Sequence, residues 1–135
     1  MMETSTLQSA LVEYFAPWVQ ELGLRVENFD ADSVTLRLPQ RDALSRVGGM
    51  LCGQAMMAAA DTAMVLALIN HFGSFRPCTT VQMNTSFLKP LSNQDALVQA
   101  RVLRAGKTLA FGEIDLRGAD GGKSVCRASV TYALL

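Results

Sequence analysis

A single carboxylate, Asp61, lies within an otherwise apolar stretch of the sequence, GMLCGQAMMAAADTAMVLALIN (residues 49–70). An ionised carboxylate among apolar side chains is costly unless it is hydrogen-bonded, paired or open to a polar cavity. A lone acid of this kind is more often held by a loop or by backbone amides than used in chemistry. The residues around Asp61 therefore decide which interpretation to prefer.

Three glycines, Gly48, Gly49 and Gly53, come before the apolar run that begins at Ala55. They predict that the first turn of a helix exposes its amides with no side chain in the way. Because a helix N-terminus favours negative charge, such amides can bind the oxygen of a polarised carbonyl group. Glycines before a helix often form only a tight loop. Together with an interior carboxylate, however, they indicate chemistry at a carbonyl group.

Gly53 and Asp61 cannot serve one carbonyl group within a single chain. Asp61 follows Gly53 by eight positions, which corresponds to a rise of about 12 Å along a helix. The two groups would meet if a second helix ran antiparallel to the first, with Gly53 of one protomer facing Asp61 of the other. The chemistry therefore predicts a dimer with two equivalent sites.

The periodicity of apolar residues predicts the helices that would position these groups. Residues 55–69 are apolar on almost every side except at Asp61 and Thr62, which predicts a buried helix. It is shorter than the roughly 20 residues that span a bilayer, and a central aspartate would be costly there. A first helix, interrupted or kinked at Pro17 and ended by Gly23, is predicted by apolar residues at three- and four-residue steps: Leu7, Leu11, Tyr14, Phe15, Trp18 and Leu22.

Alternating apolar and polar residues predict the strands. SVTLRLP (33–39) is a half-buried strand that can pair with LRVENFD (24–30). Four long strands follow the buried helix: TTVQMNTSFLKP (79–90), QDALVQARVLRA (94–105), KTLAFGEIDLRG (107–118) and KSVCRASVTYALL (123–135). We expect one α+β domain over residues 1–135, with an antiparallel sheet of five or six strands curled around the buried helix.

Composition and charge exclude several classes of function. Twelve basic and twelve acidic residues cancel, and no basic run is present, so we expect neither a nucleic acid nor a membrane as partner. Three widely spaced cysteines and one histidine predict no disulfide framework and no metal site. Glu3 stands where a secretory signal would carry basic residues, and no long apolar segment follows it, so we expect a cytoplasmic protein.

Three separated motifs resemble the PaaI-like hotdog-fold acyl-CoA thioesterases, the group of the phenylacetate pathway and of the human hotdog thioesterases. They are CGQAMMAAADTAM (52–64), TTVQMNTSFLKP (79–90) and RAGKTLAFGEIDL (104–116), and the resemblance covers most of the chain from about Arg46 onward. It implies a long helix wrapped by an antiparallel sheet, and two protomers that form a continuous sheet as a homodimer or as a dimer of dimers, a homotetramer. It implies acyl-CoA as the substrate and no further cofactor.

The resemblance also implies roles for individual residues. Asp61 matches the acid that attacks the thioester carbonyl or activates the water that does so. Gly53 matches the glycine whose amide binds the oxyanion. Thr80, or else Thr79, matches a hydroxyl that orients the water or the acid, although either threonine alone is more simply a β-branched strand residue.

The chain departs from the family pattern where the buried helix begins. Cys52-Gly53-Gln54 replaces the usual His-Gly-Gly, and Arg46 stands where an Asn often helps to hold the carbonyl. Gln54 either donates its amide toward the thioester or only occupies the first turn, and Arg46 is either a phosphate contact or a surface charge. Cys52 has no base near it in the sequence, since His71 follows 19 residues later, so we interpret it as a packing residue.

Coenzyme A would need cations for its phosphates. Lys89, Arg104 and Lys107 are the candidates, although each alone is more simply a solvated charge at a strand end or turn. Five methionines could line an acyl tunnel or simply fill the core: Met50, Met56, Met57, Met64 and Met83.

Taken together, these patterns favour an acyl-CoA thioesterase that acts on an aromatic or a short- or medium-chain acyl group. One alternative is a non-catalytic hotdog module that binds acyl-CoA, because the His and Asn of the family are replaced. Another is a hotdog hydratase or dehydratase, for which His71 lies too near the far end of the helix. No local motif identifies the acyl group.

Overall fold

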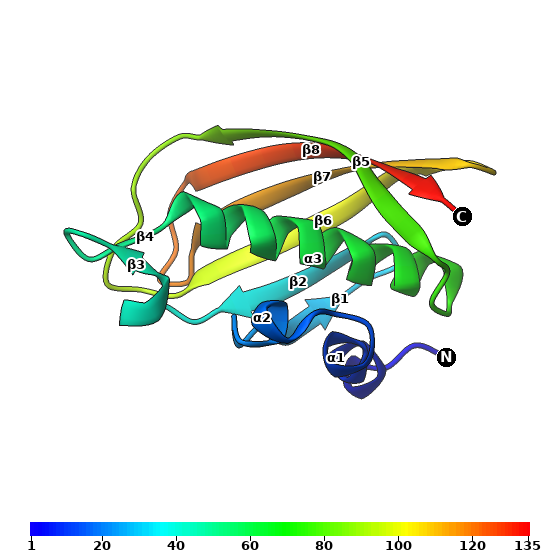
Figure 1. The fold of residues 1–135 in the computed structure, drawn as a ribbon, viewed down its shortest axis with the longest axis horizontal. Coiled ribbons are helices and arrows are strands. Elements are labelled where there is room, and N and C mark those ends of the chain that lie inside the picture. The colour runs from blue at the N-terminus through cyan, green and yellow to red at the C-terminus, as the bar shows by residue number, and fades with distance from the viewer.

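The central helix is the axis of the fold. In the computed structural model, which describes all residues from Met1 to Leu135, helix α3 runs from Gly53 to Phe72 (Figure 1). It begins after the extended residue Cys52 and ends at Gly73, whose left-handed φ of 83° lets its amide donate to the carbonyl of Ile69 at 2.8 Å. With 20 residues, α3 is longer than the predicted range 55–69.

The greater length of α3 corrects one prediction. By length and composition alone α3 could cross a membrane, contrary to the expectation that it is too short. However, 61% of its most apolar 18-residue window is buried inside the fold, so packing against the sheet accounts for its apolar character.

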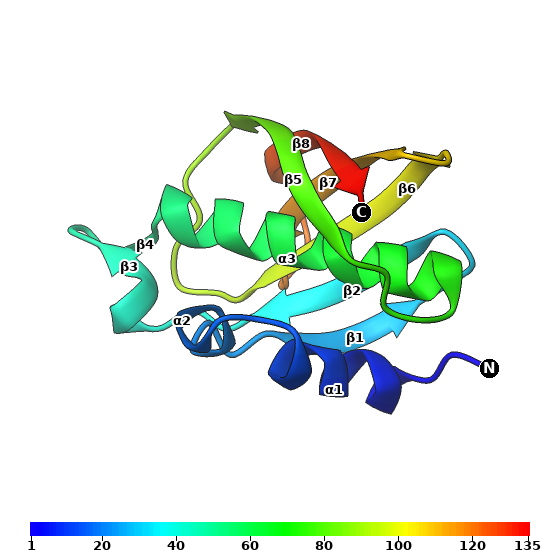
Figure 2. The same cartoon turned by 45° about the vertical axis from the view of Figure 1, so that its right-hand side comes forward.

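A six-stranded antiparallel sheet curls around α3 (Figures 1 and 2), which confirms the predicted α+β fold class. The strand order is β1-β2-β6-β7-β8-β5, so β1 and β5 are the two edges. The strands are β1 (Arg25–Phe29), β2 (Ser33–Leu38), β5 (Cys78–Phe87), β6 (Ala96–Ala105), β7 (Leu109–Gly118) and β8 (Ser124–Leu134). Five of them lie within segments that the alternation of residues predicted, and β5 begins one residue before its predicted segment, at Cys78.

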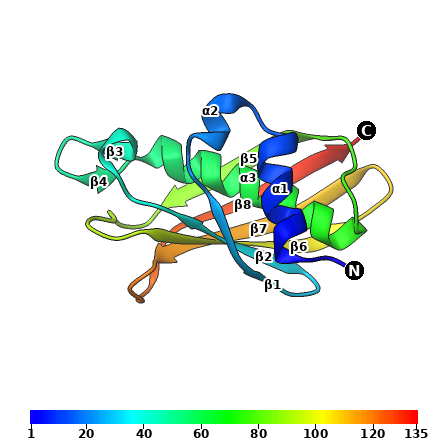
Figure 3. The ribbon, with the colours of Figure 1, turned by 90° about the horizontal axis from the view of Figure 1, so that it is seen from below.

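The N-terminal helix is interrupted at Pro17, one of the two predicted alternatives, rather than kinked. Helix α1 spans Thr4–Glu13 and helix α2 spans Pro17–Gln20. Proline lacks an amide hydrogen and suits the first turn of a helix, so Pro17 starts α2 rather than bending α1. In Figure 2 both helices lie on the β1 side of α3, and in Figure 3, seen from below, α1 lies in front of α3; α1 contacts both β1 and α3.

A small hairpin before α3 was not predicted. It follows the short 3-10 helix η1 (Asp42–Leu44) and consists of β3 (Ser45–Arg46) and β4 (Met50–Leu51). Gly48 and Gly49 form its turn with φ values of 100° and 79°, the left-handed region that glycine favours. Gly48 and Gly49 thus precede α3, as expected, whereas Gly53 is the first residue of α3 itself.

A β-bulge in β5 sets which of its residues face α3. The register between β5 and β8 shifts at Val81, between the pairs Thr80–Tyr132 and Met83–Val130. Successive residues of a strand point to opposite faces, so an inserted residue puts Thr80 and Met83 on the same face. That face is the one that also carries Tyr132 and Val130, both buried.

The prediction that α3 is buried on every side was wrong. A stripe of residues at three- and four-residue steps is left exposed or half-buried along α3: Gln54, Met57, Ala58, Asp61 and Val65. In this single chain the sheet and the N-terminal helices cover the remainder of α3 but not this stripe. Asp61 is thus half-buried on an open face of α3.

Candidate active site

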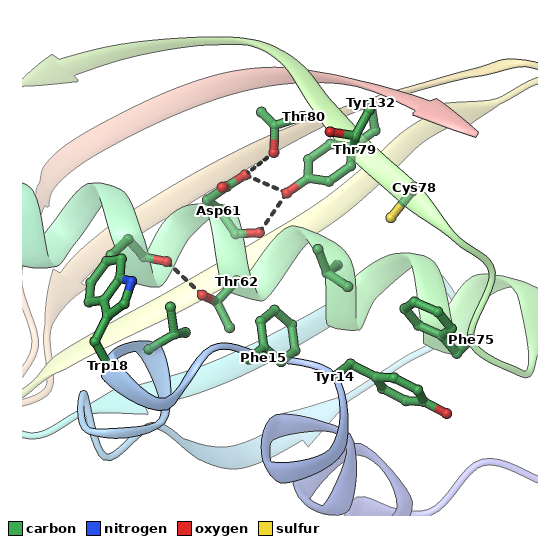
Figure 4. Close-up of a pocket in the computed structure, with 13 residues that line it drawn as sticks. Tyr14, Phe15, Trp18, Asp61, Thr62, Phe75, Cys78, Thr79, Thr80 and Tyr132 are labelled. Carbon is green, nitrogen blue, oxygen red and sulfur yellow. Dashed lines mark hydrogen bonds between the residues drawn. The ribbon is translucent and has the colours of Figure 1, made fainter. Parts of the chain in front are cut away.

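Two hydroxyl groups from the sheet meet the carboxylate of Asp61 (Figure 4). Thr80 Oγ1 donates to Asp61 Oδ1 at 2.8 Å. The Tyr132 hydroxyl contacts the same Oδ1 and also lies 2.9 Å from the main-chain carbonyl oxygen of Asp61. Since Thr80 and Tyr132 are partners on adjacent strands, the register of the sheet brings both hydroxyls to one point on α3.

The other polar residue of the helix centre has no such role. Thr62 is buried, and its hydroxyl donates to the carbonyl of Ala58 at 2.7 Å, one turn earlier in α3. Thr62 is therefore satisfied within its own helix. Asp61 instead depends on the sheet for its hydrogen bonds.

A cavity of about 330 Å³ lies beside Asp61. Aromatic side chains from the N-terminal segment and from the loop after α3 line it (Figure 4): Tyr14, Phe15, Trp18 and Phe75. Tyr14 stacks on Phe75 with ring centroids 4.0 Å apart. Asp61 is the only charged side chain in the lining. A carboxylate thus faces an aromatic pocket that can hold a small organic group.

The titratable neighbours of Asp61 are neutral near pH 7. Burial, followed by the charge of Asp61 and the hydrogen bond to it, raises the pKa of Tyr132 far above its ordinary value. Burial and the charge of Asp61 also raise the pKa of the Cys78 thiol, and desolvation raises the pKa of Tyr14. No other titratable group lines the cavity.

The N-terminus of α3 opens onto a second cavity, of about 470 Å³. Gly53, Arg46 and Lys89 all line it. A Cβ at Gly53 would lie 3.2 Å from the Phe87 ring, so any larger residue would crowd this point. A helix N-terminus with two cations nearby suits a negatively charged group.

Of the remaining candidates, two lie apart from these two cavities and one lines the Asp61 cavity. Gln54 and Cys52 line a third cavity, of about 400 Å³, together with Trp18 and Arg41. Thr79 lines the Asp61 cavity but makes no hydrogen bond to Asp61.

The two distal cations and the histidine are also outside the site. Arg104 lies near the end of β6 and Lys107 in the next turn, and neither lines any of the three cavities. His71 is exposed near the C-terminal end of α3, with its ring edge-on to Phe72. The structure thus groups Asp61 with Thr80 and Thr79, and Gly53 with Arg46 and Lys89, in separate places.

Tyr132 was not predicted from the sequence. The signal was present in SVTYALL (129–135), where Val130, Tyr132 and Leu134 share the inward phase of the strand. A buried phenol needs a partner for its hydroxyl, and a carboxylate in the facing helix is one.

Comparison with known proteins gives consistent matches. The family model described as "Thioesterase superfamily" matches residues 48–125. "Putative esterase Ta0293" from Thermoplasma acidophilum is 28% identical over 116 residues, 85% of this chain and 86% of that protein. Human "Acyl-coenzyme A thioesterase 13" is 32% identical over 88 residues, 64% of this chain and 61% of that protein. A crystal structure of a mutant of thioesterase PA1618 from Pseudomonas aeruginosa superposes with a TM-score of 0.87 and is 25% identical in sequence. The alignment covers 100% of this chain and 95% of the PA1618 chain.

Proposed function

The chain belongs to the thioesterase superfamily and is a thioester hydrolase with the hotdog fold; we propose that its substrate is an acyl-CoA and that Asp61 is its reacting carboxylate. The observation that carries this proposal is the setting of Asp61: it is the one charged group in an aromatic cavity, held by two hydroxyls. One relative, the human protein, is named for acyl-coenzyme A, which supports that substrate class.

The proposed chemistry is transfer of the acyl group to water. The amide of Gly53 binds the carbonyl oxygen, which draws electrons from the carbonyl carbon. The Asp61 carboxylate takes a proton from a water molecule whose oxygen adds to that carbon, or adds to it directly to give an anhydride that water then hydrolyses. In both routes the C–S bond breaks, the thiolate of CoA leaves and is protonated, and the products are a free acid and CoA.

A second copy of the chain completes this site. Gly53 and Asp61 line different cavities of one chain, about 12 Å apart along α3. The edge strand β5 carries unpaired backbone groups, and α3 has an uncovered stripe. We propose that two protomers pair along β5, so that their α3 helices run antiparallel and Gly53 of one meets Asp61 of the other. We propose that such dimers assemble further as a dimer of dimers.

Arg46 and Lys89 are the better candidates for the CoA phosphates. Both line the Gly53 cavity, beside the positive end of the α3 dipole. Arg104 and Lys107 line neither that cavity nor the Asp61 cavity. Gln54, in the neighbouring third cavity, is near enough to the start of α3 to act as an additional donor. No cofactor other than the CoA of the substrate enters the proposed reaction.

The test is steady-state hydrolysis of aromatic and aliphatic acyl-CoAs by the wild type and by Asp61→Asn. We expect kcat to fall about 10²- to 10⁴-fold on the best substrate, the range for loss of a general base. Asp120→Asn, the same change at an exposed aspartate in the β7–β8 turn, is the matched control and should keep wild-type turnover. Circular dichroism and size-exclusion chromatography check folding and assembly.

Two outcomes would contradict the proposal. Full activity of Asp61→Asn would remove Asp61 from the reaction. If the wild type instead binds acyl-CoAs but hydrolyses none of the panel, the protein is an acyl-CoA-binding module and not an acyl-CoA thioesterase. The loss of turnover would then be assigned to Cys52 and Arg46, which stand where the family has His and Asn.

A further inference from the structure

The two oxygens of the Asp61 carboxylate have different surroundings. Both hydroxyl contacts, from Thr80 and from Tyr132, fall on Oδ1. Oδ2 has no hydrogen-bond donor within the chain. A carboxylate oxygen that accepts two hydrogen bonds has less free electron density than its partner, so the two oxygens are unequal before any substrate binds.

Tyr132 holds more than the carboxylate. Its hydroxyl carries one hydrogen, which is shared between Oδ1 and the main-chain carbonyl oxygen of Asp61. The phenol therefore contacts the backbone and the side chain of the same residue and restricts the rotation of that side chain. Figure 4 shows these two contacts on one side of Asp61.

Tyr132 is itself rigidly placed. Its side chain is only 2% exposed, and β8 is hydrogen-bonded on both sides, to Ala110 of β7 and to Thr80 of β5. A buried phenol in a central strand has little freedom to rotate or shift. Thr80, by contrast, is exposed on the edge strand. Of the two donors, Tyr132 is the better fixed.

We propose that Tyr132 is a positioning residue for the thioesterase reaction: it holds Oδ1 of Asp61, so that Oδ2 is the oxygen that takes the proton from water or attacks the thioester. This inference rests on the proposed role of Asp61. Because the Tyr132 phenol stays protonated over the working pH range, it remains a donor throughout the catalytic cycle and transfers no proton itself. Its effect is to orient the carboxylate.

The first test is Tyr132→Phe, which keeps the ring and removes the hydroxyl. We expect kcat to fall about 10- to 100-fold with KM within about twofold, since a hydrogen bond to a charged group is lost but the cavity is kept. A loss of packing that deformed the cavity would instead raise KM together with the fall in kcat.

The second tyrosine provides a matched control. Tyr14 lines the same cavity, but its hydroxyl points away from Asp61 and makes no hydrogen bond to it (Figure 4). Any effect of Tyr14→Phe should therefore fall on KM, through the wall of the cavity, and not on kcat. The chain has only two tyrosines, so in this variant Tyr132 is the sole tyrosine.

A measurement without turnover keeps the test valid if Tyr132→Phe is poorly folded. The Tyr14→Phe protein is labelled with 3-fluorotyrosine, and the ¹⁹F resonance of residue 132 is recorded at neutral pH with and without the further change Asp61→Asn. We expect the resonance to shift when Asp61→Asn is added, because the carboxylate that the phenol contacts is replaced by a neutral amide. An identical resonance in the two proteins would overturn the contact.

The outcomes separate this inference from the proposed function. If Asp61→Asn is inactive while Tyr132→Phe keeps the wild-type kcat, positioning by Tyr132 is refuted and the role of Asp61 stands. If Asp61→Asn is fully active, the proposed role of Asp61 fails first, whatever the ¹⁹F resonance reports.

Discussion

At the residue scale, Asp61 is stabilised by hydroxyls of the sheet rather than by backbone amides. The sequence indicated an acid that needed partners, and Thr80 was correctly named as one of them. Tyr132 could not be found in the same way, because a tyrosine at an inward strand position looks like ordinary core until its neighbour across the fold is known. The catalytic roles of Asp61, Gly53 and Thr80 stay predictions.

The hydroxyl of Thr80 can be tested separately from that of Tyr132. Thr80→Val replaces the hydroxyl with a methyl group of similar size, so we expect kcat to fall about 10-fold, because the carboxylate loses a donor that orients it. Thr131→Val, one residue before Tyr132 and on the opposite face of β8, is the control and should behave like the wild type. A wild-type kcat in Thr80→Val would show that the hydrogen bond to Asp61 has no part in turnover.

At the element scale, long periodic segments were predictable and short or irregular ones were not. Six strands and the central helix follow from periods of two and from an apolar run. The hairpin β3–β4 has strands of two residues each, too short for any periodicity. The bulge at Val81 is a mismatch of register between β5 and β8, so it exists only once the strands have paired.

A close approach of β7 to α3 at Gly112 gives a prediction about stability. A Cβ at Gly112 would lie 2.3 Å from Met64 Sδ and 2.9 Å from the carbonyl oxygen of Arg101. Met64 can move aside, but the main chain of β6 cannot, so Gly112→Ala should lower the free energy of unfolding by about 1–3 kcal/mol. Urea denaturation measures the change.

Gly106→Ala is the comparison for this change. The closest atom to a Cβ at Gly106 is the carbonyl oxygen of Leu109, at 3.3 Å, so the crowding is milder. Equal losses of stability in the two variants would show that the contact between α3 and β7 is not the constraint on residue 112.

At the scale of the whole molecule, the single chain presents two halves of a site. The aromatic cavity with Asp61 and the cation-lined cavity with Gly53 open at different points along α3. This separation was predictable from the eight-residue spacing and the helical rise alone. The shapes of the cavities were not, because they depend on side chains that are distant in the sequence: those between Tyr14 and Val19 beside Asp61, and those between Phe87 and Pro90 beside Gly53.

The proposed dimer places Met57 at its two-fold axis. If Gly53 of one antiparallel helix faces Asp61 of the other, the residue midway between them faces its own copy. Met57 is exposed in the single chain, at 38% of its surface, and lies on the uncovered stripe of α3. In the dimer it would therefore pack against Met57 of the partner subunit rather than line an acyl tunnel.

A charge at position 57 should break this assembly, and the opposite charge should restore it. Met57→Lys and Met57→Glu each put two like charges at the axis, at a cost of several kcal/mol, so each variant should be monomeric and inactive. An equal mixture of the two should form a heterodimer and regain turnover, because lysine then faces glutamate. Light scattering with activity assays on both variants and on the mixture measures this, and Met57→Leu should behave as the wild type. The shared site is argued from the separation of about 12 Å between Gly53 and Asp61 along one helix. A monomer that still hydrolyses acyl-CoA would contradict it, because a single chain would then perform the whole reaction.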